Sequence, residues 1–181
     1  GRGRCSLRVA IPVLSAMGIQ VCPVPTAVLS AHTGYSEFVM RDLTDFMKPA
    51  LEHYKKMDMK FDCVYSGFLA SSEQIDHCLE FFEAFPDALK VVDPVMGDGG
   101  KAYKTYTKEL CSRMVELVKV ADIITPNLTE AAILLGEEYP TASMRSSEIK
   151  SWLVRLSTQG AKIIVITFVN LADGGMSSDG Y

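Results

Sequence analysis

The chain has 181 residues, of which 48% are hydrophobic and 22% are charged, so it holds enough apolar material for one sizeable core. Its net charge is −4 and Lys and Arg form no run beyond the opening GRGR, which argues against a nucleic-acid-binding protein. No apolar stretch approaches the ~20 residues of a membrane span, and the five scattered cysteines favour neither a disulfide framework nor a zinc site, which indicates a cytoplasmic protein.

Short apolar segments rich in Val and Ile alternate along the chain with amphipathic helical patterns. The apolar segments are typical of strands covered on both faces, and they lie at residues 19–30, 61–68, 89–94, 121–126 and 161–168. Apolar residues at i, i+3, i+4 and i+7 predict helices over residues 41–57, 71–85, 107–121 and 146–156. This alternation predicts right-handed crossovers and an α/β fold, a three-layer α/β/α sandwich with a mostly parallel central sheet in a single domain.

Residues that could bind a ligand, most of them polar, lie where these predicted strands end. In a parallel sheet, ligands bind outside the carboxyl ends of the strands. The residues at these ends are His32 and Thr33, then Phe68, then Asp93 and Asp98, then Thr125, Asn127 and Glu130, and finally Thr167. Five such strand ends in succession predict one ligand site along a single edge of the sheet.

The common phosphate-binding loops do not explain this site. GRGRCS lacks the third glycine of a dinucleotide fingerprint, and GGK at residues 99–101 lacks the other residues of a Walker loop. Magnesium bound to nucleotide phosphates is usually held by only one or two carboxylates, often through water. Asp98 and Glu130 are therefore candidate magnesium-binding residues.

Each acidic residue also has a structural interpretation. Asp98 lies in GDGG, where it fits a turn, and Asn127 and Glu130 have the spacing of a capping box at the start of a helix. The capping box and a ligand role for Glu130 can coexist, because a helix N-terminus also favours anionic ligands. Asp93 ends an apolar strand, where a carboxylate needs a partner, either another side chain, a cation or a ligand.

Longer motifs follow the order and approximate spacing found in pyridoxal kinases of the ribokinase-like superfamily. They are PTAVLSAHTGY, YSGFLAS, VVDPVMGDGGKAY, ADIITPNLTEAAILLG and IIVIT, and the opening GRCSL…IPVLSAMGI resembles the first helix of those enzymes. The resemblance covers essentially the whole chain. It implies a three-layer α/β sandwich, a homodimer, and transfer of the ATP γ-phosphoryl group to the 5′-hydroxyl of pyridoxal, pyridoxine or pyridoxamine in vitamin B6 salvage.

The resemblance also implies roles for the residues at the strand ends. Asp98 and Glu130 would position Mg²⁺ largely through water. His32 and Thr33 would face the pyridine ring, with Phe68 as an apolar wall. Residues at the nucleotide, its phosphates and a monovalent cation such as K⁺ would be Asp93, Tyr103, Thr125, Asn127 and Thr167.

The chain departs from the family pattern at both ends. In the family the general base is an aspartate of a glycine-rich GTGD-type motif, which would lie beyond Tyr181, so no catalytic base is assigned here. The family's first strand is also missing ahead of GRCSL. We therefore expect residues 1–181 to form a single kinase domain that lacks its first strand and its C-terminal portion. Two alternatives stay open, a hydroxymethylpyrimidine kinase of the same superfamily and a truncated nucleotide-binding module without turnover.

Overall fold

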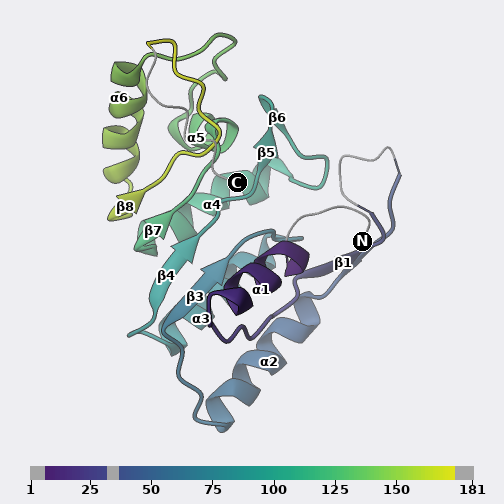
Figure 1. Cartoon of the computed structure of the whole chain (residues 1–181). Coiled ribbons are helices and arrows are strands. Elements are labelled where there is room, and N and C mark those ends of the chain that lie inside the picture. The colour runs from purple at the N-terminus through teal and green to yellow at the C-terminus, as the bar shows by residue number, and fades with distance from the viewer. Residues whose placement is uncertain (1–6, 32–36, 174–181) are drawn as a thin grey trace.

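The structure is a computed structural model that describes residues 7–31 and 37–173. It is a mixed α/β fold built around a four-stranded parallel sheet (Figure 1). The helices are α1 (Leu7–Ala16), α2 (Thr44–Lys56), α3 (Glu73–Ala84), α4 (Lys108–Val120), α5 (Leu128–Leu135) and α6 (Ser146–Ser157). The strands are β1 (Ala27–Leu29), β2 (Met40–Asp42), β3 (Cys63–Ser66), β4 (Leu89–Val92), β5 (Gly97–Asp98), β6 (Lys101–Ala102), β7 (Ile123–Ile124) and β8 (Ile163–Ile164).

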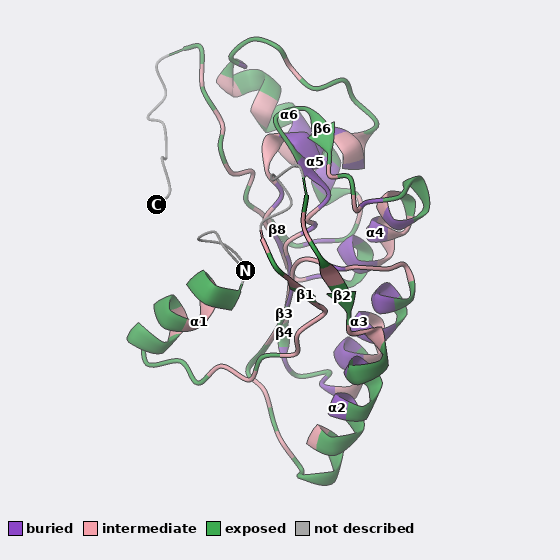
Figure 2. Cartoon of the chain, turned by 90° about the vertical axis from the view of Figure 1, so that its right-hand side faces the viewer, coloured by how far each residue is buried: buried purple, intermediate pink, exposed green. Residues whose placement is uncertain are grey.

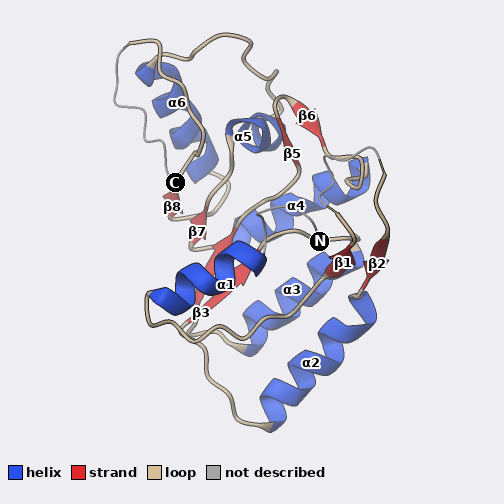
Figure 3. Ribbon diagram, turned by 45° about the vertical axis from the view of Figure 1, so that its right-hand side comes forward, coloured by secondary structure: helices blue, strands red, loops and turns tan. Residues whose placement is uncertain are grey.

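The parallel sheet has the strand order β3-β4-β7-β8, which is also their order along the chain. Helix α3 connects β3 to β4, α4 precedes β7, and α5 and α6 connect β7 to β8 (Figure 3). The α/β fold class and the parallel sheet are therefore confirmed, together with four of the predicted strands. Because all four strands run in the same direction, their carboxyl ends meet at one edge of the sheet.

The first predicted strand, residues 19–30, is not part of this sheet. Only Ala27–Leu29 forms a strand, and it pairs antiparallel with β2 in a separate two-stranded sheet. Pro23 and Pro25 remove two backbone N–H donors from the segment, so its first half cannot sustain a sheet ladder. The apolar composition of the segment predicted a longer strand because composition alone does not count the backbone N–H donors that prolines lack.

The main core lies between the sheet and the helices on one of its faces. Val92 and Ile124 of the central strands are completely buried, and so are Met114 and Leu117 of α4. On the opposite face, which we call the outer sheet face, exposure is much greater, with Tyr65 57%, Leu89 43% and Ile163 53% exposed. Figure 2 shows α1 on that side of the sheet, and none of the residues of this helix is buried. Within residues 7–31 and 37–173, helices therefore cover the outer sheet face less completely than the apolar strand sequences predicted.

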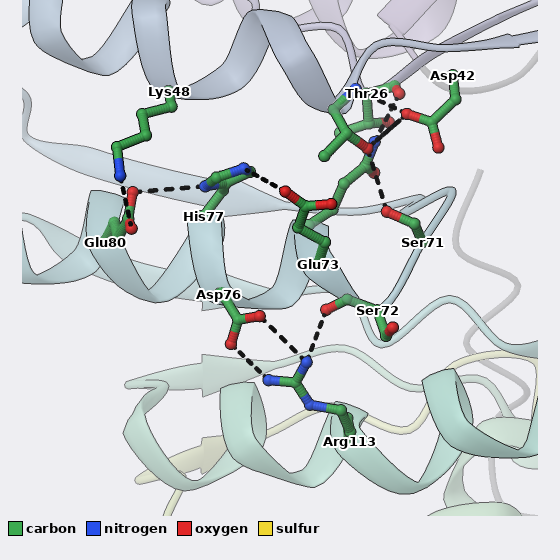
Figure 4. Close-up of polar contacts among 12 residues, drawn as sticks. Thr26, Asp42, Lys48, Ser71, Ser72, Glu73, Asp76, His77, Glu80 and Arg113 are labelled. Atoms are coloured by element: carbon green, nitrogen blue, oxygen red, sulfur yellow. Dashed lines mark hydrogen bonds and ion pairs between the residues drawn. The ribbon is translucent and has the colours of Figure 1, made fainter.

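Gln74 links the small β1–β2 sheet to the first residues of α3. This side chain is completely buried, and its Nε2 lies 2.9 Å from the carbonyl oxygen of Thr26, 2.9 Å from Thr44 Oγ1 and 3.1 Å from Asp42 Oδ1. Thr26 Oγ1 in turn donates a 2.7 Å hydrogen bond to the carbonyl of Phe68, just beyond β3. Figure 4 shows Thr26 and Asp42 near Ser71, which precedes α3. These bonds hold the β1–β2 pair beside the carboxyl end of β3.

None of the helices in residues 7–31 and 37–173 combines the length and hydropathy that crossing a bilayer requires.

Candidate functional site

The predicted site residues follow the strands of the parallel sheet at its carboxyl edge. Asp93 comes directly after β4, and its N–H donates to the carbonyl of Ser66 at 2.9 Å. Thr125 comes directly after β7, and its N–H donates to the carbonyl of Val92 at 3.1 Å. These bonds extend the sheet beyond its last assigned residues, so the strand ends lie side by side as the sequence predicts.

Asn127 and Thr167 continue the same edge toward β8. They form an isolated parallel bridge, and the Thr167 N–H donates to the carbonyl of Pro126 at 2.9 Å. His32 and Thr33, predicted to face a substrate ring, lie outside the described residues.

A tight hairpin, β5–β6, carries Asp98 beside the N-terminus of α5. Gly99 and Gly100 form its turn with φ of 57° and 78°, which favours glycine at both positions. The Gly100 N–H donates to Thr129 Oγ1 at 2.9 Å, which ties the turn to the first residues of α5. Asp98 itself is exposed, and its Oδ1 accepts a 2.7 Å bond from the Gly99 N–H. The turn interpretation of Asp98 is confirmed, and its carboxylate stays open to solvent on one side.

The predicted capping box at the start of α5 is also confirmed. Asn127 Oδ1 accepts from the Glu130 N–H at 2.9 Å, while Glu130 Oε2 accepts from the Asn127 N–H at 2.8 Å. The two capping-box side chains also make hydrogen bonds outside the helix. Glu130 Oε1 accepts from the Met96 N–H at 3.1 Å, and Asn127 Nδ2 donates to the Gly97 carbonyl at 2.8 Å. Two side chains of α5 thus fix the backbone that leads from Asp93 into the hairpin.

Glu130 and Asp93 form an acidic pair within this frame. Glu130 is only 3% exposed, and burial, together with the nearby charge of Asp93, raises the pKa of its carboxyl group to about 7, although its backbone N–H donors act in the opposite direction. Burial also raises the pKa of Asp93, and the hydroxyl of Tyr65 partly offsets that shift. A bound cation would therefore stabilise the ionised forms of both carboxyl groups and lower their pKa values.

Tyr65 is a site residue that our sequence interpretation missed. Its Oη donates a 3.1 Å hydrogen bond to Asp93 Oδ2 from the neighbouring strand β3. Although the Tyr65 side chain is largely exposed, loss of solvation around its hydroxyl and then the charge of Asp93 raise the pKa of that hydroxyl, so it remains a donor at neutral pH. Within the strand pattern Tyr65 is one more apolar residue. Only the pairing of β3 with β4 shows that it lies beside an acid.

Phe68 and Tyr103, the remaining predicted residues, both have their rings near that of Tyr106. Phe68 is half-buried, with its ring edge-on to that of Tyr106 at a centroid distance of 5.8 Å. Tyr106 Oη accepts from the Leu69 N–H at 3.0 Å, which fixes this aromatic corner. Tyr103 is half-buried just after β6, and its N–H donates to the Met96 carbonyl at 2.9 Å.

The acidic residues were tested as a metal site. In the part of the chain that the structure describes, no three His, Cys, Asp or Glu side chains gather closely enough to hold a metal ion. Glu130 uses both oxygens for backbone N–H groups, whereas Asp98 is exposed. This donor set does not form an all-protein metal cage. It suits a Mg²⁺ ion that arrives with phosphate groups and keeps most of its water, because such ions need only one or two carboxylates.

Two hollows in the structure lie away from this edge. One, of about 330 Å³, is lined by residues around Lys60 and Phe85, and the other, of about 380 Å³, lies between α2 and α3 near His77. Neither includes a residue predicted for the site. We place the candidate site at the carboxyl edge because the polar side chains converge there and because parallel sheets bind ligands at that edge.

Comparison with known proteins finds similar kinases. Residues 10–179 match the family described as phosphomethylpyrimidine kinase. The pyridoxal kinase PdxY of Deinococcus radiodurans is 28% identical over 181 residues, which cover 93% of this chain and 59% of that protein. A crystal structure with pyridoxal, of a Bacteroides thetaiotaomicron protein described as a phosphomethylpyrimidine kinase, is 46% identical with a TM-score of 0.89, covering 95% of this chain and 60% of that one.

A more distant solved structure contains a nucleotide. The pyridoxal kinase of Leishmania donovani in complex with ADP and pyridoxamine is 27% identical with a TM-score of 0.78, covering 95% of this chain and 62% of that one. The chain spans between about a third and three fifths of the length of the curated relatives it matches first.

Proposed function

The chain belongs to the phosphomethylpyrimidine kinase family, and from this premise we propose that it forms part of an ATP-dependent pyridoxal kinase. The reaction would transfer the γ-phosphoryl group of ATP to the 5′-hydroxyl of pyridoxal, pyridoxine or pyridoxamine. One observation carries the proposal. The Asn127 and Glu130 side chains of the capping box fix the backbone of Met96 and Gly97, which leads from Asp93 into the Asp98 hairpin, at the edge where a parallel sheet binds ligands.

The proposed nucleotide site comprises the ends of β4, β7 and β8 with the hairpin. Its residues would be Asp93 beside the phosphates, with Tyr103, Thr125, Asn127 and Thr167 around the nucleotide and a monovalent cation such as K⁺. Asp98 and Glu130 would hold Mg²⁺ through water, and Mg²⁺ would neutralise charge on the transferred group. The open carboxylate of Asp98 and the raised pKa of Glu130 support this assignment, because a cation relieves the cost of an ionised buried acid.

Phosphoryl transfer requires little from the protein beyond the positioning of the reactants and the stabilisation of negative charge. Phosphoryl transfer has a transition state with negative charge spread over the equatorial oxygens, so fixed donors and held cations supply most of the stabilisation. The capping box contributes by fixing the backbone from Met96 to Gly97 before any ligand binds. We assign no general base among residues 1–181. The alcohol itself would meet His32, Thr33 and Phe68.

The second candidate function is a hydroxymethylpyrimidine kinase. The description of the matching family favours it, whereas the pyridoxal bound to the Bacteroides thetaiotaomicron relative favours the first. The two functions share the nucleotide site and differ only in the alcohol that is phosphorylated. A non-catalytic nucleotide-binding module would bind Mg-ATP and form no product.

One experiment separates these three functions. The intact protein that contains this chain is incubated with Mg-ATP and either pyridoxal or hydroxymethylpyrimidine, and the phosphorylated product is quantified by mass spectrometry. We expect pyridoxal 5′-phosphate, with kcat/KM for pyridoxal exceeding that for hydroxymethylpyrimidine by about tenfold or more, a difference of only about 1.4 kcal/mol. The reverse preference would establish the second function. Nucleotide binding without product from either alcohol would reject both.

The assembly and location of the protein are part of the proposal. We propose a homodimer in the cytoplasm, checked by light scattering of the intact protein and by cell fractionation.

A further inference from the structure

Tyr65 and Asp93 lie on neighbouring strands at positions that bring their side chains together. In the parallel register of β3 and β4, Tyr65 is paired with Val91. Asp93 is two residues beyond Val91, so its side chain projects from the same sheet face as that of Tyr65. Long side chains reach such diagonal neighbours across a sheet, which places the Tyr65 hydroxyl beside the carboxylate without distortion of either strand.

Gly67 leaves room for Tyr65 to lean toward the carboxyl edge of the sheet. A Cβ atom added at Gly67 would lie 3.6 Å from Tyr65 Cε1, so the tyrosine ring passes directly over this residue. The ring flank stays exposed, while its hydroxyl ends 3.1 Å from Asp93 Oδ2. A larger side chain at position 67 would share this space with the ring. The segment Tyr65-Ser66-Gly67 therefore directs a phenol hydroxyl to the end of the adjacent strand.

We propose that Tyr65 is a positioning residue, whose hydroxyl holds the Asp93 carboxylate in the orientation in which it meets the phosphates of the nucleotide. The inference deepens the proposed function and rests on it. Tyr65 itself would contact neither ATP nor the alcohol. Its effect on the reaction would pass through one oxygen of Asp93.

The surroundings of Asp93 explain why an orienting donor is needed. Glu130 of α5 and Tyr106, before α4, both interact electrostatically with Asp93, whose charge contributes to the raised pKa of each, while burial raises the pKa of Asp93 itself and the Tyr65 hydroxyl opposes that shift. A hydrogen bond to the charged form of a carboxylate stabilises that form and fixes its rotamer.

The test compares Tyr65→Phe with wild type in the intact protein. The substitution removes one hydroxyl and keeps the ring over Gly67. We expect kcat for pyridoxal phosphorylation to fall by about five- to tenfold while KM for pyridoxal changes by less than about twofold, since the lost interaction serves the transition state. Tyr54→Phe, which removes a hydroxyl from α2, is the matched control and should leave both constants unchanged.

A double-mutant cycle then links the effect to Asp93. In an Asp93→Asn background, Tyr65→Phe should have no further effect on kcat, because the carboxylate that it positions is gone. If Tyr65→Phe lowers kcat by the same factor in both backgrounds, or leaves kcat unchanged in the wild-type background, the proposal is overturned.

A spectroscopic measurement keeps this inference separate from the proposed function. In protein labelled with ¹³C at Asp side-chain carboxyls, the Asp93 resonance, assigned with Asp93→Asn, should shift in Tyr65→Phe and stay in place in Tyr54→Phe. An inactive wild-type protein would reject the kinase function, and the resonance would still decide whether Tyr65 orients Asp93. An unchanged Asp93 resonance overturns the inference whether or not the protein is a kinase.

Discussion

Glu130 shows how one side chain can both build a site and give it charge. Its two oxygens accept backbone hydrogen bonds from Asn127 and Met96, so the carboxylate is part of the architecture. The same burial that makes these bonds effective opposes its ionisation. Ionised Glu130 therefore destabilises the folded protein, and a bound cation would reduce this electrostatic cost.

This cost predicts a pH dependence of stability. The pKa of Glu130 rises from 4.5 to about 7 on folding, so between these values the folded state binds the proton more tightly than the unfolded state. The contribution of Glu130 to the free energy of unfolding therefore falls as the pH rises through this window, by up to about 3 kcal/mol, and is constant below and above it. In Glu130→Gln this loss should be absent.

Urea unfolding without Mg²⁺ at pH 4.5 and pH 7.5 measures the effect. Wild type should lose more stability over this interval than Glu130→Gln, although the variant is less stable overall because it loses a backbone acceptor. Glu109→Gln, at an exposed glutamate in the first turn of α4, should follow wild type. Equal pH dependence in wild type and Glu130→Gln would contradict the prediction.

The local features of the site could be predicted from the sequence, and the contacts across strands could not. The capping box depends on the spacing of Asn127 and Glu130, and the hairpin turn depends on the Gly99-Gly100 pair, so both follow from neighbouring residues. The Tyr65 bond to Asp93 depends on the register of β3 against β4, and the Thr129 bond to Gly100 depends on how α5 docks. Such contacts have no signature in a single sequence.

At the scale of helices and strands, α3 acts as the support for its neighbours. Arg113 of α4 donates to Asp76 of α3 and to the carbonyl of Ser72 at its start (Figure 4). This ion pair is partly exposed to solvent and is worth about 1 kcal/mol. The completely buried Gln74 on the other side of α3 has much more effect, because it has no water to replace a lost partner.

We therefore predict that Gln74→Leu destabilises the protein. Leucine has a similar size but leaves the Thr26 carbonyl and the Ala70 N–H, which now donates to Gln74 Oε1 at 2.8 Å, without their partner. The free energy of unfolding should fall by about 2–4 kcal/mol, as expected for several unsatisfied buried groups.

Urea denaturation checks this value. Gln20→Leu, the same change at an exposed glutamine, should shift the free energy of unfolding by less than about 0.5 kcal/mol. A Gln74→Leu variant as stable as Gln20→Leu would show that these hydrogen bonds do not hold the β1–β2 pair.

Helices α2, α3, α4 and α6 were predictable at this scale because each carries its own apolar period, as Leu110, Met114, Leu117 and Val118 do in α4. The separate β1–β2 sheet was not. It depends on Gln74 and Thr26, which belong to different elements and whose contacts appear only once α3 packs.

At the scale of the whole molecule, helices cover the two faces of the parallel sheet unequally. The sheet packs against helices on one face, whereas α1 lies on the other side with no buried residue. Helix α4 has four buried residues, Leu110, Met114, Leu117 and Val118. Two helices of similar length thus differ greatly in what holds them to the fold.

We predict that their amides exchange with solvent at very different rates. Helix α1 should open locally, whereas α4 should open only with the core, so α4 amides should be protected at least about 100-fold more than those of α1. Hydrogen–deuterium exchange with mass spectrometry of the 181-residue chain measures both in one sample. The amides of β4, in the middle of the sheet, serve as the reference for global opening. Protection of α1 equal to that of β4 would contradict the prediction.

The strand order β3-β4-β7-β8 has a consequence for synthesis. The strands leave the ribosome in the order in which they occupy the sheet, so each new strand adds to an existing edge and none has to enter between two earlier ones. The entropy cost of closing each crossover grows only slowly with its length. During translation of residues 63–164, this four-stranded sheet can therefore grow at one edge, where each new strand meets its final neighbour.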